Sequence, residues 1–401
     1  FSHRQSFFDY GCGRGADIEF VSSLGKKANG WDPIHRPDAR RSKCAIVALT
    51  YVLNVIENVA ERSRVLADAW ALAKDVLVVS VRLEADRDDA HVRPYSDGWM
   101  TTRGTFQRFY DHLEFAEWLA DELDTEVVPA APGVFYVFRS TLTREEFNSR
   151  RYMLRIPAPH ARKSDGAFTS NRELLQELID FFALHGRLPS ESELSQGAEI
   201  VEVMGSIGKA FRVIETVTDR DEWLKLVDRR RIDLLVYLAL RFFDGAYRMS
   251  DLAPVTQRDV RAHFKSFDRG SKAAQTLLFG VGNLEKISIG CRSSTVGKLT
   301  PSALYVHVDA LEYVPALLKV YEACARRIIG DVPGINIVKL HRDKKMVSYL
   351  SYPDFDTDPH AGLDESWIVD LVAQTVKRRT YRSAPNVPIL HRKEDFLTST
   401  D

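Results

Sequence analysis

The chain has 401 residues, 45% of them hydrophobic, which is typical of a folded protein with two or three domains. Its 55 Lys and Arg nearly balance its 56 Asp and Glu, so the formal charge of -1 excludes a globally basic nucleic-acid coat and leaves only local basic faces. No apolar run is long enough to cross a bilayer, so we expect a cytoplasmic protein without a membrane partner. The cysteines are too far apart to indicate a zinc finger or a disulfide framework: Cys12, Cys44, Cys291 and Cys324.

The first 140 residues alternate strand and helix patterns. Residues 6–8 predict a short apolar strand, which is followed by a glycine-rich turn and a helix that opens at Ile18. Residues 45–49 and 76–81 are typical of buried parallel strands, and an Ala-rich helical stretch separates them. This order predicts an α/β, Rossmann-like domain over residues 1–140.

The remaining chain predicts three further segments. Residues 141–165 show no steady periodicity, so we expect a linker there. Residues 166–265 space their apolar side chains as helices do and predict a mainly helical domain. Residues 266–401 alternate shorter helices and strands, which indicates a smaller α+β C-terminal region.

The run from Asp9 to Gly15, Asp-Tyr-Gly-Cys-Gly-Arg-Gly, places small residues where a strand turns sharply into a helix. Glycine leaves room for a ligand against the backbone. Such turns often bind phosphate, but Asp9 would repel an anion, so a cationic cofactor that carries an amino-acid group fits better. Asp32, at the end of the next strand, can accept hydrogen bonds from both hydroxyls of a ribose. The alternative is a turn that only packs a helix on a strand.

At these residues the sequence resembles class I methyltransferases that use S-adenosylmethionine (SAM), whose first motif is an acidic residue, an apolar or aromatic residue and Gly-x-Gly-x-Gly. The resemblance implies S-adenosyl-L-methionine as cofactor, with the glycines along its methionine and ribose portions, Asp9 near its amino group and Asp32 on its ribose. The chain from Asp32 to Ala45 is too short for the helix, strand and acidic adenine contact that the family commonly has there. We therefore expect a reduced adenine side. The predicted cofactor-binding set is Asp9, Tyr10, Gly11, Cys12, Gly13, Gly15 and Asp32.

The segment from Tyr51 to Glu57 follows the third clear strand, where the class I family places residues that face the sulfonium and the substrate. We predict Asn54 and Tyr51 as the catalytic residues that shape this site. A helix N-cap is the alternative role for Asn54. The segment contains neither an Asn/Asp-Pro-Pro-Tyr element nor a Pro-Cys nucleophile, so the reaction type stays open.

The chain also resembles, over nearly its whole length, the DNA phosphorothioation-associated methyltransferase family of bacterial proteins. The residues that carry this resemblance are 9–15, 30–33, 51–57, 103–107, 352–356 and 388–394. The resemblance implies methyl transfer to nucleic acid, with DNA favoured, in a bacterial phosphorothioation or defence system. Other proteins of such a system would then be partners.

Arg103, Phe106 and Arg108 are the predicted substrate-binding residues. They belong to a run that interleaves arginines with aromatics beyond the carboxyl edge of the sheet. Arginine can hold phosphate, and aromatic rings can stack on unpaired bases. A packed lid with surface arginines is the alternative.

Two other regions carry weaker patterns. Residues 182–189 and 204–211 are similar to small helix-turn-helix repeats appended to homing-type nucleases, which indicates a DNA-binding module or a packing domain with a solvated basic face. An acidic segment alternates possible metal ligands, but without partners from elsewhere we predict no metal site: Asp354, Asp356, Asp358 and His360.

The sequence therefore predicts methyl transfer from SAM to nucleic acid, catalysed by proximity and orientation more than by a strong base. The alternative is a non-catalytic DNA-binding or regulatory protein on a degenerate methyltransferase scaffold. The short adenine side favours that alternative.

Overall fold

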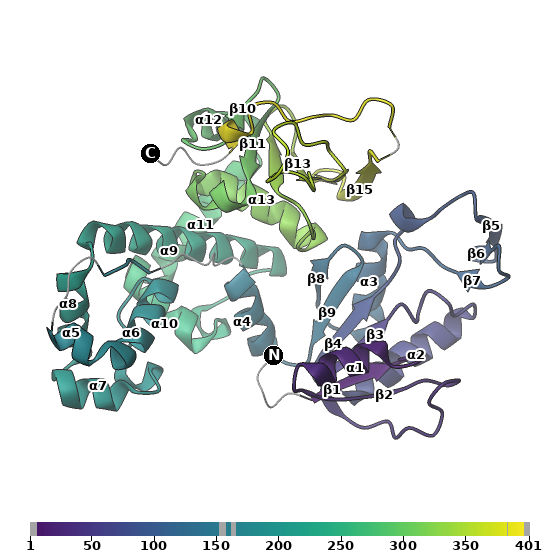
Figure 1. The fold of residues 1–401 in the computed structure, drawn as a ribbon, viewed down its shortest axis with the longest axis horizontal. Coiled ribbons are helices and arrows are strands. Elements are labelled where there is room, and N and C mark those ends of the chain that lie inside the picture. The colour runs from purple at the N-terminus through teal and green to yellow at the C-terminus, as the bar shows by residue number, and fades with distance from the viewer. Residues whose placement is uncertain (1–5, 152–157, 162–165, 383, 397–401) are drawn as a thin grey trace. The chain divides into compact units, whose positions relative to one another are not determined.

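The computed structural model describes residues 6–151, 158–161, 166–382 and 384–396 (Figure 1). The chain folds as two compact units. The first takes its described residues from 1–144, 288–313 and 324–401, and the second from 145–287 and 314–323.

The first unit begins with a six-stranded sheet in the order β2-β1-β3-β4-β9-β8. The first four strands are parallel, and β9 runs antiparallel to both of its neighbours. The strand order reverses between β1 and β3, which in open α/β sheets is where ligands bind, beyond the carboxyl ends of the strands. The strands are β1 (Ser6–Tyr10), β2 (Lys27–Trp31), β3 (Cys44–Thr50), β4 (Ala73–Ser80), β8 (Val127–Ala131) and β9 (Val134–Phe138).

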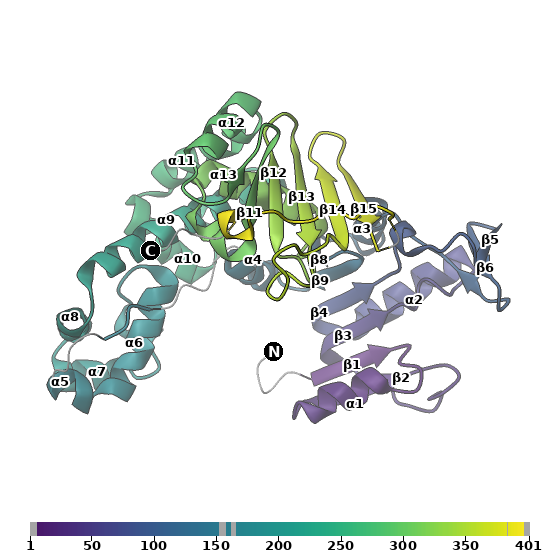
Figure 2. The same ribbon diagram turned by 45° about the horizontal axis from the view of Figure 1, so that its top comes forward.

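Three helices pack on this sheet: α1 (Ala16–Ser23), α2 (Val59–Leu72) and α3 (His112–Leu123). Helix α1 lies against β1 and β2, while α2 and α3 pack on each other and on β3, β4 and β8 (Figures 1 and 2). The Asn58 side chain accepts the N–H of Glu61 and begins α2, and Asp111 begins α3 in the same way. The central strands bury apolar side chains on both faces, as parallel sheets between helices do.

A small antiparallel sheet is inserted between β4 and α3. Its strands are β5 (Val92–Tyr95), β6 (Gly98–Thr101) and β7 (Phe106–Gln107). Phe106 forms its core, because the ring fills the space beside Gly98 and meets Tyr95 edge-on. The insert follows the carboxyl end of β4 in the chain.

The first unit ends with a second six-stranded sheet, in which every neighbouring pair is antiparallel. Its strands are β10 (Lys298–Leu299), β11 (Ala303–His307), β12 (Ile337–His341), β13 (Met346–Ser351), β14 (Glu365–Asp370) and β15 (Thr375–Thr380). Contacts from side chains tie this part to the remainder of the unit. His112 Nε2 donates to the Ile328 carbonyl at 3.0 Å, and Arg378 pairs with Asp86 at 2.9 Å.

The second unit is helical. Its core surrounds Phe182, Phe211 and Trp223, with the two phenylalanine rings stacked at 4.2 Å and the indole edge-on to both. The chain crosses from one unit to the other within helices α4, α12 and α13. The helices are α4 (Thr141–Arg151), α5 (Gly166–Ser170), α6 (Arg172–His185), α7 (Gly197–Met204), α8 (Ile207–Val217), α9 (Arg220–Arg241), α10 (Pro254–Phe264), α11 (Phe267–Val281), α12 (Leu284–Ser293) and α13 (Ala316–Ile329).

The division into units differs from the predicted boundaries at 140, 165 and 265. Helix α4 occupies the start of the predicted linker, and Glu145, buried within it, bonds to Tyr237 and Arg241 of α9. Residues 152–157 and 162–165 of the predicted linker lie outside the described residues. Helices continue to Ser293, and the C-terminal sheet joins the first unit through contacts that are remote in sequence.

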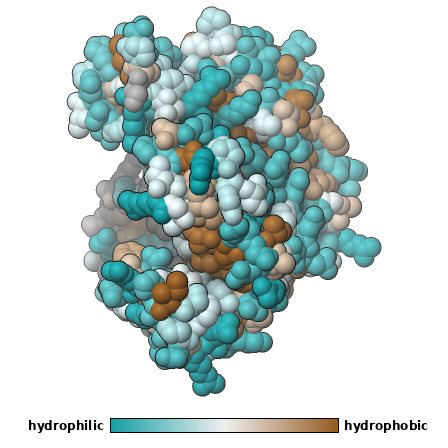
Figure 3. Space-filling model, turned by 90° about the vertical axis from the view of Figure 1, so that its right-hand side faces the viewer, coloured by the Kyte–Doolittle hydropathy of each residue, from teal (hydrophilic) through white to brown (hydrophobic). Residues whose placement is uncertain are grey.

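The surface is mixed in polarity. Seen from the side that carries β5 to β7, apolar residues gather in patches among polar ones (Figure 3). The segment that follows β3 contributes exposed apolar side chains, namely Tyr51, Val55 and Val59. Within the described part of the chain, no helix combines the length and the apolar character needed to cross a membrane.

Candidate functional site

The turn after β1 has a backbone that only glycine adopts easily. Gly11, Gly13 and Gly15 have φ values of 86°, 51° and 93°, in the left-handed region. The N–H groups of Gly11 and Cys12 both donate to the Trp31 carbonyl, at 2.8 and 3.1 Å. The end of β2 therefore fixes the start of the turn.

The three glycines differ in what surrounds them. A Cβ on Gly11 would lie 2.4 Å from Val52 Cγ2, and one on Gly15 would lie 2.7 Å from Arg36 Nη2. A Cβ on Gly13 would meet nothing within 4 Å. The turn is thus closed at its two ends and open in the middle, as a cradle for a ligand must be.

Asp32 holds the middle of the turn from the next strand. Its Oδ2 accepts the Gly13 N–H at 3.0 Å, and its Oδ1 accepts the N–H groups of Ile34 and His35 at 2.9 and 2.8 Å. Burial opposes ionisation, but these three donors outweigh it and hold the pKa of Asp32 below its ordinary value. A carboxylate has about four acceptor positions, so about one remains for a ribose hydroxyl, where the sequence predicted two contacts.

Asp9 lies beneath the turn and is only 4% exposed. Burial, followed by the negative charges of Asp17 and Asp32, raises its pKa to about 6. Gly30 on the adjacent strand brings the backbones together, since a Cβ there would lie 2.8 Å from the Asp9 carbonyl oxygen and 2.6 Å from Ile18. Among the described residues, no side chain or N–H group donates to the Asp9 carboxyl. A cationic group beside it would supply the missing charge.

Tyr10 and Cys12 do not direct their side chains into the cradle as cofactor ligands. The Tyr10 hydroxyl meets Asp68 of α2 and Arg41, each at 3.3 Å, and its ring packs on Trp31. Cys12 is buried beside Gly30. Their contribution to a cofactor site is therefore restricted to the backbone.

Tyr51 stands at the carboxyl end of β3 in a strained conformation. Its φ is 57°, which a residue with a Cβ rarely adopts, and its N–H donates to the Ser80 carbonyl at 2.9 Å. The side chain is 52% exposed. Strain of this kind persists where the surrounding structure enforces it, often at functional sites.

The structure corrects the role predicted for Asn54. This residue is fully buried, and its amide bonds to the main chain of two other segments: Nδ2 donates to the Arg108 carbonyl at 2.5 Å, and Oδ1 accepts the Arg82 N–H at 3.0 Å. Its own carbonyl accepts the Arg108 N–H at 2.7 Å. Asn54 positions the loops around the site and does not face a substrate. The alternative role is also wrong, because Asn58 caps α2.

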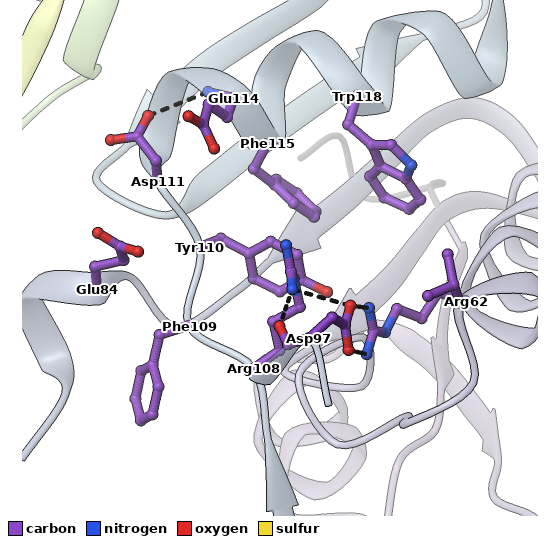
Figure 4. Close-up of a pocket in the computed structure, with 11 residues that line it drawn as sticks. Arg62, Glu84, Asp97, Arg108, Phe109, Tyr110, Asp111, Glu114, Phe115 and Trp118 are labelled. Carbon is purple, nitrogen blue, oxygen red and sulfur yellow. Dashed lines mark hydrogen bonds and ion pairs between the residues drawn. The ribbon is translucent and has the colours of Figure 1, made fainter. Parts of the chain in front are cut away.

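A cavity of about 300 Å³ lies beside this segment, between α2, α3 and the inserted sheet. On one side, Asp97 pairs with both Arg62 and Arg108; on the other, aromatic side chains of α3 point inward (Figure 4). The Tyr110 hydroxyl donates to the Leu53 carbonyl at 3.1 Å, so the cavity wall is bonded to the chain that follows β3. The lining residues are Val59, Arg62, Glu84, Asp97, Arg108, Phe109, Tyr110, Asp111, Glu114, Phe115 and Trp118.

The three predicted substrate residues have different surroundings. Arg103 is exposed at the tip of the turn between β6 and β7, and Arg108 lines the cavity with its guanidinium on the Tyr110 ring at 5.1 Å. Phe106 is only 7% exposed and packs inside the small sheet, which corrects its predicted role as a stacking platform. The structure brings Arg108 to the cavity and leaves Arg103 outside its lining.

Sequence reasoning missed three residues here. Arg36 covers Gly15, and Arg62 with Asp97 forms the charged floor of the cavity. The ion pair of Arg62 with Asp97 joins a helix to a hairpin turn, so no local sequence pattern predicts it. Across the described chain, no group of three or more His, Cys, Asp or Glu side chains is placed to hold a metal ion.

The outer edge of the first sheet agrees with the short adenine side predicted from the sequence. Residues 33–43 form turns without a helix or strand between β2 and β3, so β2 is the edge strand. The Trp31 indole donates to the Pro37 carbonyl at 3.1 Å and closes this loop. A ligand base beyond Asp32 would therefore meet a loop in place of a further strand.

Comparison with solved structures gives methyltransferases, each matched over about a third of the present chain. A 1,6-didemethyltoxoflavin-N1-methyltransferase from Burkholderia thailandensis, with bound S-adenosylhomocysteine, is 15% identical over 34% of this chain and 72% of its own, with a TM-score of 0.28. A sugar N-methyltransferase from a Streptoalloteichus species is 15% identical over 34% and 81%, with a TM-score of 0.28. A SAM-bound amino pentose methyltransferase from Micromonospora echinaspora is 15% identical over 34% and 84%, with a TM-score of 0.25.

Likenesses of this size carry no argument about function. The strand order and the glycine turn show that the N-terminal part has a Rossmann-like fold of the class I methyltransferase type, as the sequence predicted. No family model and no curated relative matches the chain. The specific resemblance to the phosphorothioation-associated family therefore stays a prediction.

Proposed function

We propose that this chain is a SAM-dependent methyltransferase. The observation that carries the proposal is the open position over Gly13, next to a buried carboxyl at Asp9, where the strand order reverses. When bound, SAM supplies a methyl group activated by a positive sulfonium. The backbone of residues 11–15 would hold its methionine portion, Asp9 its ammonium group and the remaining acceptor of Asp32 one ribose hydroxyl.

The chain's own residues would act mainly by orientation. Tyr51 and its exposed neighbours Val55 and Val59 provide an apolar surface at the end of β3. Arg108 uses one nitrogen on Asp97, while its Nε and Nη2 donate to no described residue and can bind an anionic substrate group. Asn54 holds both segments in register.

The finer proposal is a nucleic-acid substrate, with DNA favoured. The exposed ring of Tyr51 could stack on a base, and the guanidinium groups of Arg108 and Arg103 could hold phosphate. The context of phosphorothioation or defence rests on the sequence resemblance alone. Comparing oligonucleotides with and without backbone sulfur as methyl acceptors tests that context.

One observation favours a scaffold without catalysis. The sheet ends at β2, and Asp32 already uses about three of its four acceptor positions within the protein. Both features reduce what the adenosine portion of a cofactor could contact. A protein of this kind would bind DNA and regulate without transferring a methyl group.

Calorimetric titration with SAM, followed by transfer of labelled methyl groups to duplex and single-stranded DNA, separates these functions. Saturable binding and label in DNA support the methyltransferase. Saturable binding with label only in a non-nucleic-acid acceptor retains methyl transfer and overturns the DNA substrate. Absence of SAM binding by the folded protein overturns the proposed enzyme.

A further inference from the structure

The helical unit contains two helix pairs with the same turn. Gly205, whose φ is 81°, caps the C-terminus of α7, and the Ser206 hydroxyl accepts the N–H three residues ahead to begin α8. Lys265, whose φ is 65°, caps the C-terminus of α10, and Ser266 begins α11 in the same way. Each pair is thus joined by one left-handed residue and one capping serine.

Lys265 occupies a position that glycine fills in the first pair. A residue with a Cβ adopts the left-handed region only at a cost in stability. In the first pair a lysine also reaches the turn, because Lys209 Nζ lies 3.2 Å from the place where a Cβ of Gly205 would be. Both turns therefore carry an ammonium group, and the second keeps it despite the strain.

The second turn is surrounded by exposed cations. Arg261, Lys265 and Arg269 lie on the end of α10, the turn and the start of α11. None of these three side chains forms a hydrogen bond or ion pair with any residue that the structure describes. The nearby acid, Asp268, is paired with Lys272 at 3.1 Å. The surface around this turn thus has an uncompensated positive charge.

Basic residues near residue 230, on helix α9, differ from these. Arg230 is buried and bonds to Asp233 and to the Ala183 carbonyl, and Arg231 pairs with Asp228. Their charges are used within the unit. The second turn, by contrast, gathers three exposed cations, on a helix pair that sequence similarity did not reach.

We propose that the α10–α11 pair docks on double-stranded DNA, with Arg261, Lys265 and Arg269 on the phosphates and α11 toward the major groove. Three unpaired cations around the turn between the two helices complement a polyanion. An α-helix fits the major groove of B-form DNA, whereas that of A-form RNA is too narrow for side-chain readout. Exposed Thr276 on α11 is then available to the duplex. The docking requires no methyl transfer.

Fluorescence anisotropy of the full-length chain with a labelled 30-base-pair duplex, titrated with salt, tests the docking. Lys265→Gly removes the cation and the strain together, so DNA binding should weaken about threefold or more while the melting temperature stays equal or rises. Log affinity falls as log salt rises, and each lost phosphate contact should make this fall less steep by about 0.9. The triple variant Arg261→Gln, Lys265→Gly, Arg269→Gln should lower it by about 3.

Lys225→Gln, an exposed cation of α9 outside both turns, is the matched control and should leave affinity unchanged. Unchanged binding and slope in the folded triple variant would overturn the assignment, as would equal loss in the control. Competition by duplex RNA as strong as by DNA overturns the major-groove geometry. Salt-insensitive or absent binding of the wild-type chain to DNA overturns the proposal. That outcome does not bear on SAM binding, which calorimetry tests separately.

Discussion

The Asp32 carboxylate accepts the backbone N–H of Gly13 at 3.0 Å, so the second strand holds open the turn that follows the first. The same carboxylate also accepts the N–H groups of Ile34 and His35. Replacing Asp32 would therefore disturb the turn as well as any ribose contact. A substitution at Gly13, the open position of the turn, changes the cradle without removing these hydrogen bonds.

Gly13→Ala places a methyl group in the open space over the turn. We expect SAM affinity to fall at least tenfold, because the methyl group occupies the position of the ligand. Gly25→Ala is a matched control, since Gly25 also has a positive φ, of 72°, and nothing within 4 Å of an added Cβ, but lies at the end of α1. Both variants bear a similar backbone cost, of the order of 1 kcal/mol.

Calorimetry on both variants, with their melting temperatures, reads the two effects separately. Equal losses of stability with a loss of SAM affinity only in Gly13→Ala support the cradle. If both variants bind SAM like the wild type, the cofactor lies elsewhere.

Asp9→Asn should stabilise the free protein at neutral pH. Asp9 keeps a pKa of about 6 when folded, against 3.8 in an unfolded chain, so its ionisation opposes folding at pH 7 by up to about 3 kcal/mol. Below pH 6 the folded form binds the proton first, and this opposition disappears as pH falls toward 3.8. Urea unfolding at pH 7 and pH 5 measures it. The gain in the variant should be larger at pH 7.

The same substitution should weaken SAM binding. An ammonium or sulfonium near Asp9 favours the carboxylate, so cofactor binding should release a proton and weaken as pH falls below about 6 in the wild type. Asp9→Asn should remove this pH dependence. A variant that is more stable yet binds SAM as well as the wild type would show that Asp9 does not contact the cofactor.

The turn and the missing strand could be predicted because each is local. Three glycines at alternate positions fix a backbone that other residues avoid, and the short chain after Asp32 cannot form a helix and a strand. Asn54 was misassigned because its partners, Arg82 and Arg108, are remote in sequence. A buried amide and a substrate-facing amide look alike until those partners are known.

The C-terminal region and the unit boundaries were harder for the same reason. Glu145 is charged and lies in a stretch without periodicity. It is nevertheless buried, and its carboxylate is paired with Tyr237 and Arg241. The pairing of β11 with β12 also joins strands that helix α13 separates in the sequence. Periodicity predicts elements, but not which distant element neutralises a buried charge.

Asn54→Ala should lower the stability of the protein more than it lowers kcat. The change leaves the Arg108 carbonyl and the Arg82 N–H without their partners, and each buried unsatisfied group costs about 1–3 kcal/mol. We expect a melting temperature lower by several degrees and a higher KM from displaced loops. A catalytic role would instead lower kcat with stability unchanged. Urea unfolding and steady-state kinetics on the same preparation distinguish the two.

His112 should make the first unit sensitive to acid. Burial lowers its pKa to about 4 from 6.5, with Nδ1 accepting the Gly133 N–H and Nε2 donating to Ile328. The unfolded chain therefore takes up a proton first as pH falls, and stability is lost between about pH 6.5 and pH 4, by about 3 kcal/mol. His112→Gln should flatten this slope.

Tyr51→Gly separates the cost of strain from the use of the side chain. Glycine adopts a φ of 57° freely, so the change recovers about 1 kcal/mol, and a ring that is 52% exposed loses little burial. We expect an equal or higher melting temperature together with methyl transfer at least tenfold slower, because the ring that would align the acceptor is gone. Tyr51→Phe keeps the ring and the strain and should transfer at nearly the wild-type rate. Full activity in Tyr51→Gly would mean that the strained residue serves the fold of the loop and not the acceptor.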